Sequence, residues 1–127
     1  MSTTPPAILV VDDEPQVRKV VRSVLEADGY VVAEAADGPA ALILLNSMNG
    51  PRGPHLVVLD VMMPGIDGLD VCRQIDGTRT KVVMLTARDD AETRAAAEDA
   101  GAYRFLTQPF SAVELLDAVR ELLADRD

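Results

Sequence analysis

The sequence lacks paired cysteines, a long apolar run and a signal peptide. Among 127 residues, Cys72 is the single cysteine, so no internal disulfide can form. This cysteine usage suits a reducing, cytoplasmic location. No apolar run approaches the roughly 20 residues that cross a bilayer. Residues 1–9 lack the basic flank and the long apolar stretch of a signal peptide. These absences argue against a disulfide-stapled or membrane-spanning domain, and we interpret Cys72 as a core residue on a helix.

Positive charge is also scarce. Lys and Arg number 12 against 21 Asp and Glu, which gives a net charge of −9, and tryptophan is absent. The basic residues form no cluster, so we expect no direct nucleic-acid binding by this domain and no binding to an anionic membrane. What is present, 48% hydrophobic and 26% charged residues, is typical of a globular domain with one core.

Five apolar runs alternate with five helical patterns, which predicts an α/β fold. We expect residues 1–6 to form a flexible tail and residues 7–127 to form a single domain. Three of the five runs are apolar without alternation, as in parallel strands that helices cover on both faces. Five βα units favour an open, flavodoxin-like parallel sheet in the order 2-1-3-4-5. The expected strands are 7–11, 30–35, 55–60, 82–86 and 104–107.

The helical segments carry apolar stripes with a period of 3.6 residues. A fourth helix, over roughly 90–100, is rich in alanine and weakly amphipathic. A fifth opens on Ser111 and Glu114, which have the spacing of a capping box. The stripes expected to face the core are Val17, Val20, Val21, Val24 and Leu25 on the first helix; Ala41, Leu44, Leu45 and Met48 on the second; Leu69, Cys72 and Ile75 on the third.

Acidic residues follow two strands that the expected order makes neighbours. Asp12 and Asp13 end the first strand and Asp60 ends the third, so three carboxylates meet at one edge of the sheet. Such carboxylates repel one another unless a cation neutralises them, and an all-oxygen site suits Mg²⁺. Taken singly, Asp13 has the alternative interpretation of a helix N-cap and Asp60 that of a turn residue. Their joint placement favours a site.

Several segments together resemble a known family. They are "ILVVDDEP" (8–15), "LVVLDVMMPGIDG" (56–68), "VVMLTA" (82–87), "AGAYRFL" (100–106) and "QPF" (108–110). Over essentially its whole length the chain resembles the receiver domain of bacterial two-component response regulators, the CheY-like phosphoacceptor domain. The resemblance implies the same five-stranded parallel fold. It also implies a signalling domain rather than an enzyme, whose phosphotransfer and dephosphorylation are self-catalysed.

The resemblance assigns roles to the acidic residues. It implies that Asp60 accepts a phosphoryl group from a kinase phosphohistidine. It further implies that Asp13, Asp60 and the main-chain carbonyl of Met62 hold Mg²⁺ directly, while Asp12 acts mainly through water. Phosphoryl transfer depends on positioning and charge neutralisation, which these residue types supply.

The resemblance also implies a switch and partners. Thr86 matches the hydroxyl that binds a phosphoryl oxygen, and Phe105 matches the aromatic residue that turns inward in response. Taken alone, Thr86 is also a plausible strand-end threonine and Phe105 a core residue. The implied partners are a histidine kinase or phosphotransfer protein and a downstream output domain or target. A homodimer through the fourth helix, fifth strand and fifth helix is a further option.

Gln108 departs from the family pattern, which has lysine before the proline that follows the fifth strand. A phosphorylated Asp60 carries about −2. With Asp12, Asp13 and Mg²⁺ the site is left near −2, where a lysine would leave it near −1. Arg88 is a candidate phosphate contact, although a solvated role is equally consistent with the sequence. The resemblance also implies a cis peptide between Gln108 and Pro109.

Two functions therefore remain open from the sequence. One is a phosphorylated receiver with an altered switch, which the intact aspartates favour. The other is an interaction module independent of phosphorylation, which Gln108 favours. An enzyme that uses a phosphoaspartate intermediate would need a second acid or base beside its nucleophile, and "DVMMP" (60–64) offers none.

Overall fold

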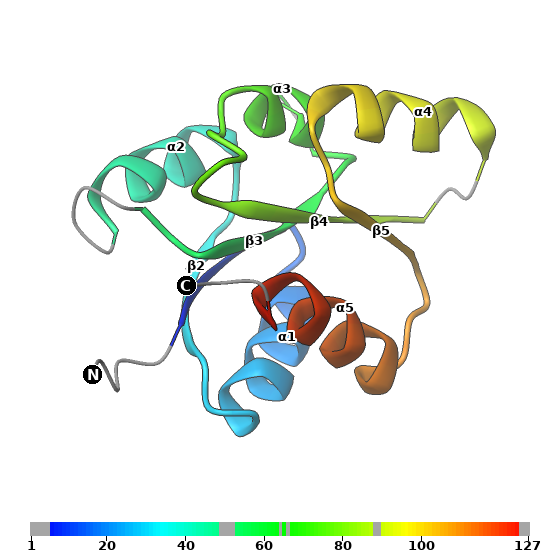
Figure 1. Cartoon of the computed structure of the whole chain (residues 1–127). Helices are drawn as coiled ribbons and strands as arrows, with labels where there is room; N and C mark the ends of the chain where they lie inside the picture. The colour runs from blue at the N-terminus through cyan, green and yellow to red at the C-terminus, as the bar shows by residue number, and fades with distance from the viewer. Residues whose placement is uncertain (1–5, 49–52, 64, 66, 88–89, 125–127) are drawn as a thin grey trace.

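Strands and helices alternate along the whole described chain (Figure 1). The computed structural model describes residues 6–48, 53–63, 65, 67–87 and 90–124. The strands are β1 (Ala7–Val11), β2 (Val31–Ala35), β3 (Leu56–Asp60), β4 (Lys81–Thr86) and β5 (Arg104–Thr107). The helices are α1 (Pro15–Ala27), α2 (Gly38–Ser47), α3 (Gly68–Arg73), α4 (Ala91–Ala100) and α5 (Ala112–Ala124). Three strands begin one residue away from the predicted position, which is within the usual variation of such boundaries.

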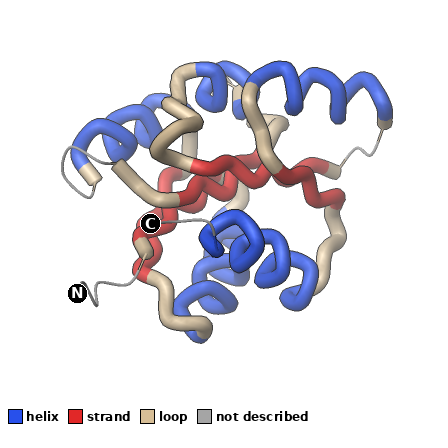
Figure 2. Tube along the Cα trace, in the orientation of Figure 1, coloured by secondary structure: helices blue, strands red, loops and turns tan. Residues whose placement is uncertain are grey.

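The sheet confirms the predicted topology. Its order is β2-β1-β3-β4-β5, and every neighbouring pair is parallel. Helices α2, α3 and α4 cover one face, while α1 and α5 cover the other (Figure 2). Alternate residues of β1 enter different cores: Leu9 and Val11 pack with the first group of helices, Ile8 and Val10 with the second. This double burial is the reason the strands are apolar without alternation.

The structure of α1 corrects one prediction and one alternative interpretation. Val20 was expected in the core but is 60% exposed, whereas Val21 and Leu25 are fully buried. The apolar stripe of α1 is therefore narrower than the sequence indicated. The N-cap position is Glu14 and not Asp13, so the alternative interpretation of Asp13 as a cap is wrong.

Other local predictions are confirmed. Ser111 Oγ accepts a hydrogen bond from the Glu114 main-chain N–H at 3.0 Å, and Glu114 Oε1 accepts one from the Ser111 N–H at 3.0 Å. The Gln108–Pro109 peptide is cis. Cys72 is buried on α3 within the core. Among the described helices, none is both long and apolar enough to cross a membrane. The proposed tail lies almost entirely outside the described residues.

Candidate functional site: an acidic cluster at the carboxyl edge of the sheet

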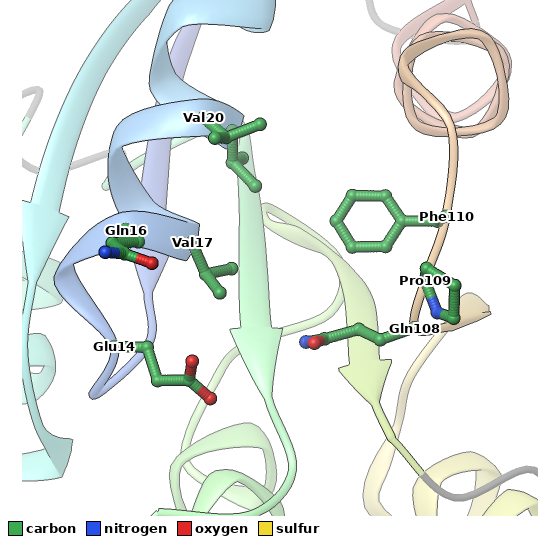
Figure 3. Close-up of a pocket in the computed structure, with 8 residues that line it drawn as sticks. Glu14, Gln16, Val17, Val20, Gln108, Pro109 and Phe110 are labelled. Atoms are coloured by element: carbon green, nitrogen blue, oxygen red, sulfur yellow. The ribbon is translucent and has the colours of Figure 1, made fainter.

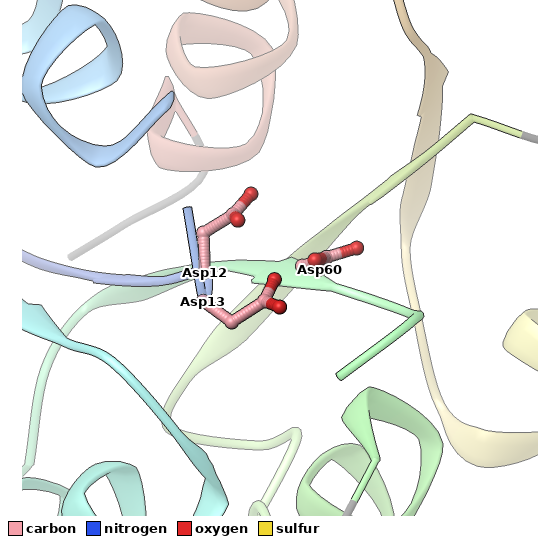
Figure 4. A group of neighbouring side chains, drawn as sticks. All are labelled: Asp12, Asp13 and Asp60. Carbon is pink, nitrogen blue, oxygen red and sulfur yellow. The ribbon is translucent and has the colours of Figure 1, made fainter. Parts of the chain in front are cut away.

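Three carboxylates meet where β1 and β3 end. These strands are neighbours, with Val11 paired to Leu59, so the residues that follow them come together. One carboxylate oxygen each from Asp12, Asp13 and Asp60 lie within 4.8 Å of one another. Figure 4 shows the three side chains gathered around one space at the strand ends. The proximity predicted from the sequence is therefore present.

The three carboxylates differ in their surroundings. Asp12 is 1% exposed and Asp60 is 7% exposed, whereas Asp13 is exposed. The Asp12 Oδ1 accepts a hydrogen bond from the Glu14 N–H at 2.9 Å, and the Asp60 Oδ1 accepts one from the Met62 N–H at 3.1 Å. The second contact spans two residues, so Asp60 also serves the turn function that was its alternative interpretation.

Burial makes Asp12 and Asp60 reluctant to ionise. Loss of solvent, followed by the charge of Asp12, raises the pKa of Asp60 to about 7, against the lowering effect of the Met62 N–H. Burial is also the main reason that the pKa of Asp12 is raised. The buried Asp12 Oδ2 has no hydrogen-bond partner among the described residues. An unpartnered buried oxygen beside two further carboxylates fits a hard divalent cation.

The segment after β3 is built to hold Asp60 in place. Gly65 has a φ of 76°, a left-handed conformation that favours glycine. The Asp67 side chain accepts a hydrogen bond from the Asp70 N–H and caps α3, which begins at Gly68. The Gly68 N–H donates to the Val61 carbonyl at 3.1 Å, which brings the start of α3 against the end of β3. Gly65, Asp67 and Gly68 therefore serve the site through the local backbone conformation and contacts.

Thr86 and Phe105 lie on the strands that extend the sheet away from the cluster. Thr86 ends β4, one residue beyond Leu85, which is the β4 partner of Asp60, and it is fully buried. Phe105 is partly buried on β5, and the Arg94 guanidinium lies 4.7 Å from the centre of its ring. The switch roles of both residues remain predictions.

Gln108 lies at a groove beside the acidic cluster. Its N–H donates to the Thr86 carbonyl at 2.7 Å, which ties it to the end of β4. Figure 3 shows its side chain pointing across the groove toward Glu14 and Val17 of the α1 region. The groove has a volume of about 260 Å³. It is lined by Glu14, Gln16, Val17, Val20, Val21, Gln108, Pro109 and Phe110.

Sequence reasoning missed this groove. Val20, which was expected in the core, is one of the residues that line it. The role of the candidate phosphate contact remains a prediction. Arg88 lies outside the described residues. Arg104 of β5 forms an ion pair with Glu121 of α5.

The family is shown by the sequence as well as the fold. The response regulator receiver domain matches residues 8–120, and the chain belongs to this family. It is a receiver domain of two-component signalling, which is a signalling domain rather than a classical enzyme. Receiver domains bind Mg²⁺ at an acidic pocket of this kind, and they interact with histidine kinases and output domains.

The particular relatives are bacterial response regulators. Response regulator MprA of Mycolicibacterium vanbaalenii is 48% identical over 121 residues, which are 94% of this chain and 51% of the relative. MprA of Mycobacterium tuberculosis is 48% identical over 118 residues, which are 91% of this chain and 50% of the relative. The chain therefore spans about half the length of the curated relatives it matches.

Solved structures agree with this assignment. Chemotaxis protein CheY4 of Vibrio cholerae has a TM-score of 0.85 and 28% identity, with 94% of this chain and 100% of that chain covered. Response regulator protein TrrA of Thermotoga maritima has a TM-score of 0.80 and 35% identity, with 93% and 99% covered. The TrrA structure is a complex with Mg²⁺ and BeF.

Proposed function

We propose that Asp60 accepts a phosphoryl group from the phosphohistidine of a histidine kinase or phosphotransfer protein. The observation that carries this proposal is the gathering of the three carboxylates within 4.8 Å, with Asp60 at the end of the central strand β3. An Asp60 carboxylate oxygen attacks phosphorus as the P–N bond breaks. The bonding electrons and a proton from solvent go to the histidine, which leaves as a neutral imidazole. The Asp60 carboxylate becomes an acyl phosphate.

Mg²⁺ would be held by Asp13, Asp60 and the Met62 main-chain carbonyl, with Asp12 acting through water. When bound, the ion neutralises charge on the carboxylates and the phosphoryl oxygens. The residues themselves supply the remaining requirements. The Met62 N–H orients the Asp60 carboxylate, and the buried Asp12 places an unpartnered carboxylate oxygen at the cluster. The TrrA complex with Mg²⁺ and BeF supports the same use of this acidic pocket.

The proposed output is a change in the surface formed by α4, β5 and α5. Thr86 would bind a phosphoryl oxygen and Phe105 would turn inward in response. That surface would act on an output domain or a partner protein in the cytoplasm, or would form a homodimer. The length of the MprA relatives, about twice that of the matched region, supports an output domain outside this chain.

A second candidate is an interaction module that works without phosphorylation. Gln108 favours it, because an amide brings no positive charge to a phosphorylated site. Its side chain also points across the groove toward α1 (Figure 3).

Mass spectrometry separates the two functions. Incubation with Mg²⁺ and acetyl phosphate should add one phosphoryl group to the protein, with acetate as the leaving group. Asp60→Asn should abolish the gain, while Asp117→Asn, on the exposed side of α5, should retain it. Failure of the native protein to gain mass would favour the interaction module. Persistence of the gain in Asp60→Asn would place the acceptor elsewhere.

A further inference from the structure

Arg18 reaches from α1 into the turn that carries two of the three carboxylates. Its side chain is 16% exposed. The Nη1 atom donates a hydrogen bond to the main-chain carbonyl of Asp12 at 2.7 Å, and the Nε atom donates to Glu34 Oε1 on β2 at 3.1 Å. One guanidinium therefore joins the end of β1, the first helix and the neighbouring strand.

Asp12 lies just past the end of β1, and its main chain is held from two sides. Its N–H donates to the Ala35 carbonyl at the end of β2, at 3.2 Å, and its carbonyl accepts from Arg18. Its Oδ1 is held by the Glu14 N–H, and its Oδ2 is buried toward the cluster without a described partner. Because the main chain is fixed on both sides, the carboxylate has little freedom to leave the cluster.

Glu34 orients the guanidinium. Its Oε1 accepts from Arg18 and its Oε2 accepts from Arg22 Nη1 at 2.9 Å, so both oxygens are occupied. The hydrogen bond from Arg22 and, with less effect, that from Arg18 lower the pKa of Glu34 against the raising effect of burial. A planar guanidinium that bonds a carboxylate and a carbonyl at once has a defined orientation.

The guanidinium of Arg18 is bonded to Glu34 and to the Asp12 carbonyl, so it does not take the place of the missing lysine. The main influences on the pKa of Asp12 are burial, the Glu14 N–H and the charge of Asp13, all of them local. Arg18 acts on the site through the position of the Asp12 main chain.

We infer that Arg18, oriented by Glu34, is a positioning residue for the Mg²⁺ site. The inference rests on the proposed function, because it assumes that the acidic cluster binds Mg²⁺. Loss of the contact lets the turn at Asp12 and Asp13 relax. The carboxylates then separate under their mutual repulsion, and some of the binding energy of the cation is used to bring them back.

Titration calorimetry with MgCl₂ tests this with a matched control. Arg18→Gln and Arg22→Gln each remove one arginine bonded to Glu34, but only Arg18 contacts Asp12. We expect Arg18→Gln to weaken Mg²⁺ binding about tenfold, at the lower end of the usual effect for groups that hold metal ligands. We expect Arg22→Gln to bind Mg²⁺ as the native protein does, and Glu34→Gln to lie between the two.

Melting in EDTA separates positioning from general stability. Arg18→Gln and Arg22→Gln should both remain folded without metal at the temperature of the titration, while only the first loses Mg²⁺ affinity. Arg18→Lys, which retains a donor for one of the two contacts, should recover part of the affinity, and it carries the test if Arg18→Gln does not fold. Equal Mg²⁺ affinity in the Arg18 and Arg22 variants overturns the inference alone. A native protein that binds no Mg²⁺ overturns the proposed function and this inference with it.

Discussion

A Cβ atom built on Gly68 would lie 1.9 Å from the main-chain carbonyl oxygen of Asp60. No side chain can occupy that space, so α3 approaches β3 as closely as it does only because residue 68 is glycine. Gly68 has an ordinary helical conformation. Glycine is required at this position because a side chain would meet the backbone of β3, and not because of an unusual φ angle. The start of α3 therefore fixes the position of the proposed phosphoacceptor.

Gly68→Ala should disturb both stability and the site. The methyl group meets backbone atoms, so either α3 or the end of β3 must move. We expect unfolding free energy to fall by about 3 kcal/mol, the upper part of the range for overpacking, and phosphorylation by acetyl phosphate to slow. Gly77→Ala is the control, because its nearest neighbour would be 3.9 Å away. Equal unfolding free energies of the two variants in urea would contradict the expectation.

Mg²⁺ should stabilise the fold through the acidic cluster. A ligand that binds only the native state raises stability by mass action, by about 2.7 kcal/mol at a hundred times its dissociation constant. We therefore expect the melting temperature to rise with Mg²⁺ in the native protein and much less in Asp13→Asn. The exposed variant Asp117→Asn should respond as the native protein does. A full response in Asp13→Asn would remove Asp13 from the site.

The raised pKa of Asp60 makes stability without metal depend on pH. The pKa is 3.8 ordinarily and about 7 in the folded protein, so the folded state binds the proton more tightly. Tighter proton binding by Asp60 in the folded state contributes stability that is complete below the pKa of Asp60 in the unfolded chain. This contribution is lost as pH rises through the pKa of Asp60 in the folded protein, by at most about 1.4 kcal/mol per pH unit.

Urea unfolding of native protein and Asp60→Asn in EDTA measures this effect. The asparagine variant cannot ionise at position 60. Its stability relative to the native protein should therefore increase between the two pKa values and level off above the higher one. A difference that is constant with pH would show that Asp60 titrates normally. With Mg²⁺ present the native protein should recover stability at high pH, because the cation favours the ionised carboxylate.

Gln108→Lys should strengthen the proposed switch. A cation near the phosphoryl group adds an interaction that differs between the inactive and active arrangements, and coupling energies are typically about 1 kcal/mol or more. We expect the native protein to shift Thr86 and Phe105 only partially when beryllofluoride is bound, and Gln108→Lys to shift them further. Amide NMR of residues 86–110 measures both.

Gln16→Lys is the control for the switch experiment. It adds the same charge on the α1 side of the same groove, away from the end of β5. Its beryllofluoride response should match that of the native protein. Complete switching in the native protein would show that Gln108 does not weaken the switch.

Much of this molecule could be predicted from its sequence, because the evidence is local. Apolar runs that lack alternation indicate strands buried on two faces, and five of them separated by helical periods leave few topologies. Strand ends in a parallel sheet share one edge, so Asp12, Asp13 and Asp60 could be brought together from their positions alone. The cap at Ser111 also depends only on residues three apart.

The remaining features depend on distances between segments that are far apart in the sequence. Val20 continues an apolar stripe, yet it lines a groove because the loop after β5 passes α1 there. The contact between Arg18 and Asp12 exists because Glu34 of β2 fixes the guanidinium. The sequence by itself determined the fold, the acidic edge and the neutral charge of Gln108. Only the tertiary structure decided where Gln108 points and how closely α3 approaches Asp60, because packing sets both.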